Sequence, residues 1–276
     1  MTAAPLVSLS SGHHIPQLGL GTWPFDNAQA ADVVATALEL GYRLVDTAEN
    51  YGNEEGVGEG LRRSGVPRSE IFLTTKFNRA WHSVAGVREA WENSARRLGV
   101  DYLDLFLIHW PNPDQGTYTE AWEGLLELRD EGKVHSIGVS NFTPEHLGTI
   151  IEATGVGPDV NQIQLCPYWV QHEARAYHGA HAIATESYSP LGKGQDLLAE
   201  SVVVAAAEAH GVTPAQAVLR WHTQQGLVAI PKSSSRERLA QNLDVFGFEL
   251  SAAEIAAFNA LNGSGPKAAD PNTFGH

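Results

Sequence analysis

Cysteine is almost missing from this chain of 276 residues, because Cys166 is the only one. A single cysteine excludes an intrachain disulfide, and it favours a reducing, cytoplasmic setting. The chain also lacks an excess of basic residues: 18 Lys and Arg stand against 32 Asp and Glu, for a net charge of −14. Nucleic-acid binding needs a basic surface, so we expect no nucleic-acid partner.

Long apolar segments are missing too. The most apolar stretch, Val202 to Ala209, contains Glu208 and is far too short to span a bilayer, so no membrane partner is expected. The N-terminus has no basic segment followed by an apolar one, which argues against a secretory signal peptide. We expect a cytoplasmic monomer whose partner is a small molecule.

Recognisable cofactor and metal motifs of other folds are not present. The nearest dinucleotide fingerprint, Gly19-x-Gly21-x-x-Pro24, has proline at the third glycine position, which argues against a doubly wound sheet. No P-loop is found. The twelve histidines do not form the His-x-His pattern of a barrel metallohydrolase, since His13 and His14 are adjacent and point to opposite sides of a strand. We therefore expect no metal.

What the chain does contain is an alternation of short β-branched runs with longer stretches at helical spacing. The predicted strands are Gln17–Gly21, Arg43–Asp46, Ile71–Lys76, Tyr102–His109, Val134–Ser140, Val160–Gln164, Ala182–Tyr188 and Leu227–Pro231. The predicted helices include Ala28–Leu40, Glu54–Ser64, Val84–Leu98, Thr119–Glu131, Pro144–Ala153 and Pro214–Gln224. This pattern predicts an α/β fold, a (β/α)8 TIM barrel, as one domain over residues 1–276.

The length beyond the roughly 250 residues of a typical barrel falls at the two ends. Leu6–Ile15 predicts an N-terminal β-hairpin with Gly12 in its turn. Ala252–Leu261 predicts a C-terminal helix, and a Gly/Pro-rich tail begins at Gly263.

Ionisable side chains end three successive predicted strands: Asp46, Lys76 and His109. Each alone is compatible with a structural role, as a cap, a solvated lysine or a core histidine. Barrel chemistry lies at the C-terminal ends of strands, however, and neighbouring strands are about 4.8 Å apart. Asp46 shares a strand face with Leu44, Lys76 with Thr74 and Phe72, and His109 with Leu107 and Leu105, so we expect the three side chains to converge over one mouth.

Tyr51 follows Asp46 in the next loop and is a candidate acid, although a packing role would suit it equally well. A free phenol has a pKa near 10, too high for efficient proton donation at neutral pH. An ammonium about 4 Å away contributes about 4 kcal/mol at an effective dielectric of about 20, which would lower the pKa by up to roughly three. We expect Lys76 to supply that charge, Asp46 to hold Lys76, and His109 to orient an oxygen acceptor.

At these residues the chain resembles the aldo-keto reductases, in pattern most like bacterial 2,5-diketo-D-gluconate reductases. The resemblance spans the chain, and its three motifs are Gly41–Ala48 (GYRLVDTA) with Tyr51, Glu54 and Gly58; Lys133–Phe142 (KVHSIGVSNF); and Ile230–Ser233 (IPKS) with Arg238 and Asn242. It implies that Asp46, Tyr51, Lys76 and His109 form a catalytic tetrad, that NADPH is the cofactor and that a small carbonyl compound is the substrate.

The resemblance also implies a set of cofactor contacts. The nicotinamide carboxamide would bind Ser140, Asn141 and Gln162, and its ring would stack on Tyr188. The pyrophosphate would bind Ser189 and Leu191. The 2′-phosphate would bind Lys232, Ser233 and Arg238, and the adenine would contact Gln241 and Asn242. Ser235 stands where relatives often carry a third basic residue, so a moderate preference for NADPH is expected.

The substrate pocket is the least defined part. Trp23, Trp81 and Trp110 are candidates to line it, although each could be packing instead, and Asn78 replaces a tryptophan common in relatives. We predict NADPH-dependent reduction of an aldehyde or ketone, such as a keto-sugar acid or dicarbonyl, with Tyr51 as the acid. Two alternatives stay open: a regulatory protein that senses NADPH, and a barrel lyase that uses Lys76 as a Schiff-base nucleophile.

Overall fold

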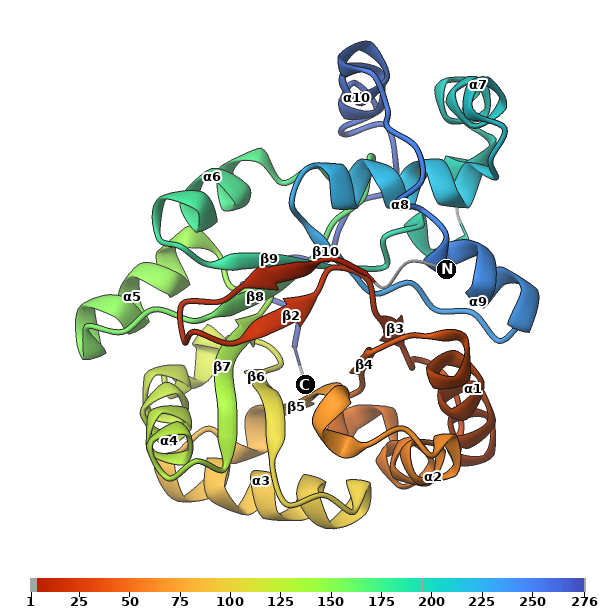
Figure 1. The fold of residues 1–276 in the computed structure, drawn as a ribbon. Coiled ribbons are helices and arrows are strands. Elements are labelled where there is room, and N and C mark those ends of the chain that lie inside the picture. The colour runs from red at the N-terminus through yellow and green to blue at the C-terminus, as the bar shows by residue number, and fades with distance from the viewer. Residues whose placement is uncertain (1–3, 195, 276) are drawn as a thin grey trace.

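Eight parallel strands form the central sheet of the computed structural model, which describes residues 4–194 and 196–275 (Figure 1). In chain order they are β3 (Leu20–Gly21), β4 (Leu44–Asp46), β5 (Phe72–Phe77), β6 (Leu103–Ile108), β7 (Val134–Ser140), β8 (Val160–Gln164), β9 (Ala184–Tyr188) and β10 (Val228–Ala229). The sheet closes on itself, because the Gly19 N–H donates to Ala229 O over 2.9 Å and the Ala229 N–H donates to Gln17 O over 3.0 Å. The predicted (β/α)8 barrel is therefore confirmed.

Helices surround the barrel and connect successive strands (Figure 1). They are α1 (Asn27–Leu40), α2 (Glu54–Ser64), α3 (Val84–Leu98), α4 (Tyr118–Asp130), α5 (Pro144–Thr154), α6 (His172–Ala180), α8 (Pro214–Gln224) and α9 (Arg236–Leu243). Two further helices, α7 (Ser201–His210) and α10 (Ala252–Asn259), stand outside this ring beside α8. Among the described residues no single helix is long and apolar enough to cross a membrane, and α7 and α8 reach that length only as a pair bent by 90°.

Two helix starts follow directly from the sequence. Thr143 and Thr213 precede prolines that carry no N–H to satisfy, and each threonine side chain accepts a hydrogen bond from the backbone three residues later. In both helices the third residue bonds back to the threonine N–H, which completes a capping box.

The N-terminal hairpin closes one end of the barrel. Strands β1 (Leu6–Ser8) and β2 (His14–Pro16) are antiparallel, and Gly12 lies in the turn with φ of 87°, as predicted. Leu9 and Ile15 are buried and join the apolar cluster inside the barrel. Figure 1 shows the hairpin lying across the barrel.

The interior of the barrel is layered from apolar to polar. The apolar layers comprise the hairpin residues and the inward side chains of five strands or their flanks, namely Leu9, Ile15, Leu44, Phe72, Leu105, Leu107, Val160, Val228 and Ile230. Because side chains alternate along a strand, the next inward positions on β4 and β5 are Asp46, Thr74 and Lys76. The C-terminal ends of the strands thus carry a polar layer above an apolar floor.

The C-terminal tail returns towards this polar end. The Phe274 ring lies 4.8 Å from the Trp110 ring, just after β6. The α10 helix ends at Asn259, two residues before the predicted end, and the tail beyond it reaches the mouth.

Candidate active site

A buried ion pair between Lys76 and Asp46 forms the centre of the polar layer. The Lys76 Nζ atom donates to Asp46 Oδ1 over 2.7 Å and to the Thr47 carbonyl over 3.0 Å. Lys76 is 0% exposed and Asp46 is 2% exposed. Burial alone would lower the pKa of Lys76, but the Asp46 carboxylate and Tyr51 raise it to about 12. The lysine is therefore a permanent cation at physiological pH.

This ion pair argues against the Schiff-base alternative. An amine attacks a carbonyl only in its neutral form, and Schiff-base lysines have lowered pKa values. The pKa of Lys76 is shifted in the opposite direction, and its Nζ is held by Asp46.

Tyr51 points its hydroxyl at the ion pair. It ends a 3₁₀ turn, Glu49–Tyr51, and its hydroxyl lies 3.4 Å from Lys76 Nζ. Burial raises the pKa of the Tyr51 phenol, and the Lys76 charge lowers it by less than burial raises it. Our expectation of a net lowering was wrong, because it counted the nearby cation and not the loss of water.

The loop that carries Tyr51 is fixed by Asn53. Its side chain is completely buried, accepts from the Thr47 hydroxyl over 2.8 Å and donates to the carbonyls of Thr22 and Phe25. These bonds tie the loop after β4 to the loop after β3, and so fix the position of Tyr51 over Lys76. Asn53 was not among the predicted site residues.

His109 completes the group at the mouth. It follows β6, is 7% exposed, and its ring lies 5.9 Å from the Tyr51 ring in an edge-to-face arrangement. Asn141 Nδ2 donates to the His109 carbonyl over 3.1 Å. The structure therefore brings together all four side chains that the resemblance assigned to a tetrad.

A second buried acid, Glu186, lies beside this group and was not among the predicted site residues. It is inward-facing on β9 and 0% exposed, and Gln162 Nε2 bonds both Glu186 Oε2 (2.9 Å) and Asp46 Oδ2 (2.8 Å). Its other oxygen, Oε1, has no hydrogen-bond partner among the described residues. Burial, and then the Asp46 charge, raise the pKa of Glu186 to about 8. The signal in the sequence was a glutamate at an inward position of a buried strand.

The predicted carboxamide contacts lie together at the ends of β7, β8 and β9. Ser140 Oγ donates to the Gln162 carbonyl over 2.9 Å, and Asn141 Nδ2 donates to Ser140 Oγ over 3.0 Å. The Tyr188 hydroxyl donates to Asn141 Oδ1 over 2.9 Å. These amide, hydroxyl and aromatic groups form one connected patch beside the tetrad, which suits a neutral carboxamide on a flat ring.

The predicted phosphate contacts lie after β10, at the start of α9. Lys232 and Arg238 are exposed, and neither forms an ion pair with a carboxylate of the described residues. Arg238 Nε donates to Ser233 Oγ over 3.3 Å. Ser235 caps α9, so it adds no charge. Two cations without acidic partners at a helix start, in a chain of net charge −14, suit a phosphate group.

The remaining predicted residues occupy varied positions. Ser189 has a left-handed backbone with φ of 52°, Leu191 packs against the core beside it, and Gln241 and Asn242 lie on the last turn of α9.

The three tryptophans predicted to line the substrate pocket differ in exposure and contacts. Trp23 is 57% exposed, Trp81 donates its indole N–H to Glu49, and Trp110 is buried between His109 and Phe274. Asn78 also donates to Glu49, over 2.9 Å. Within the described ranges no three His, Cys, Asp or Glu side chains gather as a metal site.

Comparison with known proteins decides the family. The model of the Aldo/keto reductase family matches residues 17–263. The chain belongs to the aldo-keto reductase family. Among aldo-keto reductases, it is 48% identical to one from Mycolicibacterium smegmatis over 274 residues, covering 98% of each chain. It is 43% identical to methylglyoxal reductase DkgA of Yersinia pestis, covering 100% of this chain and 99% of that one, and 43% identical to 2,5-diketo-D-gluconic acid reductase B of a Corynebacterium species, covering 99% of both.

Solved aldo-keto reductases share the fold. The structure of a Gox0644 variant in complex with NADPH superposes with a TM-score of 0.94 at 49% identity, covering 99% of both chains. The aldo-keto reductase described here is therefore an oxidoreductase, with NADP(H) as its cofactor.

Proposed function

We propose that this aldo-keto reductase reduces a small aldehyde or ketone to the alcohol with NADPH, and that Tyr51 donates the proton. The observation that carries the proposal is the Tyr51 hydroxyl 3.4 Å from a buried ammonium, Lys76, which Asp46 holds. A phenol at the mouth of a barrel and next to a fixed cation is suited to protonate an oxygen that gains negative charge.

The proton stays on Tyr51 until the substrate oxygen becomes basic. Burial raises the pKa of this phenol, so Tyr51 is protonated in the resting enzyme, and the Lys76 charge limits the rise. As charge develops on the substrate oxygen, Tyr51 gives up its proton, and the resulting phenolate is stabilised by Lys76 Nζ. Asp46 keeps the ammonium in place rather than exchanging the proton itself.

His109 would orient the carbonyl oxygen. Its ring edge faces the Tyr51 ring at 5.9 Å, so both side chains border the same small volume. An imidazole N–H there would donate to the carbonyl oxygen and direct it towards the Tyr51 hydroxyl.

When bound, NADPH supplies the hydride. Ser140, Asn141 and Gln162 would hold its carboxamide beside the tetrad, and Gln162 would use its amide oxygen, because its nitrogen bonds Asp46 and Glu186. Tyr188 would support the nicotinamide ring. The groups assigned to the rest of the cofactor are Ser189, Leu191, Lys232, Ser233, Arg238, Gln241 and Asn242.

The substrate class we propose is a keto-sugar acid or a small dicarbonyl. Two relatives of 43% identity are named for methylglyoxal and for 2,5-diketo-D-gluconic acid, both small compounds with two carbonyl groups. Trp23, Trp81 and Trp110 would border the pocket. The proposal also covers a monomeric, cytoplasmic enzyme without nucleic-acid or membrane partners, which agrees with its net charge and single cysteine.

The test is a turnover assay. The purified chain is mixed with NADPH and methylglyoxal, 2,5-diketo-D-gluconate, an aromatic aldehyde or a keto ester, and cofactor oxidation is followed with the alcohol product identified by mass spectrometry. We expect turnover with the first two. NADPH binding without oxidation in the presence of any of these carbonyls would favour the sensor alternative instead.

A further inference from the structure

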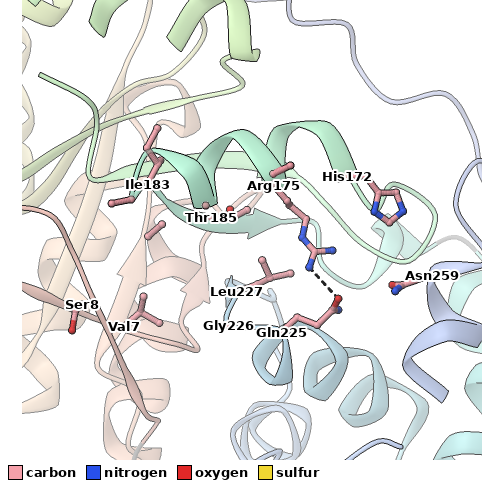
Figure 2. Close-up of a pocket in the computed structure, with 14 residues that line it drawn as sticks. Val7, Ser8, His172, Arg175, Ile183, Thr185, Gln225, Gly226, Leu227 and Asn259 are labelled. Atoms are coloured by element: carbon pink, nitrogen blue, oxygen red, sulfur yellow. Dashed lines mark hydrogen bonds between the residues drawn. The ribbon is translucent and has the colours of Figure 1, made fainter. Parts of the chain in front are cut away.

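A recess of about 590 Å³ lies at the end of the barrel opposite the mouth. Figure 2 shows it between α6, the turn from α8 to β10, and the N-terminal hairpin. Ala184, which lines it, begins β9, and Tyr188 ends the same strand at the mouth. Tyr188 lies four positions after Ala184, which is about 13 Å along the strand, so the recess is distinct from the site of carbonyl reduction.

The lining of the recess is apolar on one side and polar on the other. Val7, Ile183 and Leu227 form the apolar wall with three neighbouring alanines, and Arg175 is the only Lys or Arg among the lining residues. None of the lining residues is acidic. The volume falls within the range of about 300–1,000 Å³ that is common for small-molecule sites.

Arg175 extends from α6 into this recess with little to bind it (Figure 2). Its one hydrogen bond to a described residue joins Nη2 to Gln225 Oε1 over 3.0 Å. The amide nitrogen of Gln225 also forms a hydrogen bond, since Nε2 donates to the Trp221 carbonyl over 2.8 Å. A guanidinium has five N–H donors, so most of those on Arg175 remain available for a ligand.

The lack of an acidic partner sets Arg175 apart from the other arginines. Among the described residues only Arg96, Arg175 and Arg238 form no ion pair with a carboxylate. Arg96 and Arg238 are exposed to water, whereas Arg175 is half-buried. Burial lowers the pKa of Arg175, because no carboxylate compensates the lost hydration.

We propose that this recess binds a small monocarboxylate with an apolar body, whose carboxylate pairs with the Arg175 guanidinium. The fork of N–H groups on arginine matches the two oxygens of a carboxylate. A single cation balances one negative charge better than the two of a phosphate. The wall of Val7, Ile183 and Leu227 would cover the apolar body of the ligand.

Calorimetric titration with hexanoate tests the proposal. We expect saturable binding to the wild type and no binding of hexanamide, which has the same shape without the charge. Arg175→Gln should weaken hexanoate binding by about 10-fold or more. Arg96→Gln is the matched control, since it removes an exposed arginine that also lacks a carboxylate partner, and it should leave the affinity unchanged.

A second variant tests the location independently of the charge. Ala176 is exposed on α6 and lines the recess, so Ala176→Leu should narrow it without disturbing the core, and hexanoate binding should weaken. Three results would overturn the proposal: no saturable binding to the wild type, equal affinity in Arg175→Gln, or binding of inorganic phosphate as tight as that of hexanoate. Equal affinity, with inhibition of carbonyl reduction, would mean that the carboxylate binds at the mouth.

Discussion

The side-chain amide of Gln162 lies 2.9 Å from Glu186 Oε2, and the same nitrogen lies 2.8 Å from Asp46 Oδ2. An amide nitrogen has two N–H donors, so one glutamine bridges two buried acids. Two carboxylates facing the single Lys76 ammonium would leave one negative charge buried. The raised pKa of Glu186, about 8, means that this acid is largely neutral at pH 7 and that Asp46 carries the charge.

The pKa of Glu186 predicts a dependence of stability on pH. Because it is about 8 in the folded state and 4.5 ordinarily, the folded state keeps a proton that the unfolded state loses. The stability that comes from this proton is full below about pH 4.5 and is lost as the pH rises through about 8. Glu186→Gln does not titrate, so between pH 6 and pH 9 its free energy of unfolding should fall less than that of the wild type, by a few kcal/mol at most.

Urea unfolding at the two pH values measures this difference. Glu89→Gln, at an exposed position on α3, is the control and should follow the wild type. If Glu186→Gln also followed the wild type, Glu186 would be ionised in the folded state at pH 7.

Tyr51→Phe should lower kcat by about 10²- to 10⁴-fold, because it removes the proposed proton donor. NADPH should still quench the protein fluorescence, since the proposed cofactor contacts lie on other residues. Tyr177→Phe, on the remote helix α6, is the control and should keep normal turnover. Near-normal turnover in Tyr51→Phe would assign the proton to another group.

Lys76→Met should abolish turnover and also destabilise the protein. It would leave the Asp46 carboxylate buried without its counter-ion, which costs about 3–5 kcal/mol in comparable cases. The double variant Lys76→Met with Asp46→Asn removes both charges, so it should be inactive but more stable than the single variant. A double variant no more stable than Lys76→Met would show that the ion pair is not the source of the loss.

Lys232→Gly and Arg238→His should each raise the Kd for NADPH selectively. Charge-assisted hydrogen bonds contribute about 1.5–3 kcal/mol, so the loss of one should weaken NADPH binding by roughly 10- to 150-fold. NADH has no 2′-phosphate, and its Kd should change little. Because Ser235 adds no third charge, the preference of the wild type should be moderate. Fluorescence titration with both dinucleotides tests this, and equal weakening of both would remove the 2′-phosphate role.

Most strands and helices of the barrel could be predicted from the spacing of apolar residues. The elements that were not predicted, or were predicted with wrong bounds, have physical reasons. Strands β7 and β8 were predicted to the residue, since each is a buried run with clear ends. Helices α6, α7 and α9 were not predicted. Helices α6 and α9 are short and mostly polar and bury only one and three side chains respectively. Helix α7 is a nearly continuous apolar run, so it shows no helical alternation of apolar and polar residues. The strand predicted as Leu227–Pro231 covers only Val228–Ala229, although the Gly21 N–H still donates to the Pro231 carbonyl over 3.1 Å.

The site residues that end strands could be predicted from the sequence, whereas a site residue in the middle of a strand could not. The alternation of side chains along strands predicted that Asp46 and Lys76 point into the barrel. The resemblance to the aldo-keto reductases supplied the cofactor residues. Glu186 was missed because it lies inside a strand rather than at its end. The direction of the Tyr51 pKa shift was wrong because the degree of burial depends on how the whole mouth packs, which spacing along the chain does not reveal.

The N-terminal hairpin has a consequence for proton exchange. Among the described residues, Leu9 and Ile15 are buried at the far end of the barrel, so the hairpin separates the layer of Asp46, Lys76 and Glu186 from solvent on that side. A molecule bound in the mouth would cover the other side of this layer, and we expect it to slow the exchange of the Glu186 proton with solvent. We expect the acid to equilibrate with the solution between turnovers and to keep one protonation state during each of them.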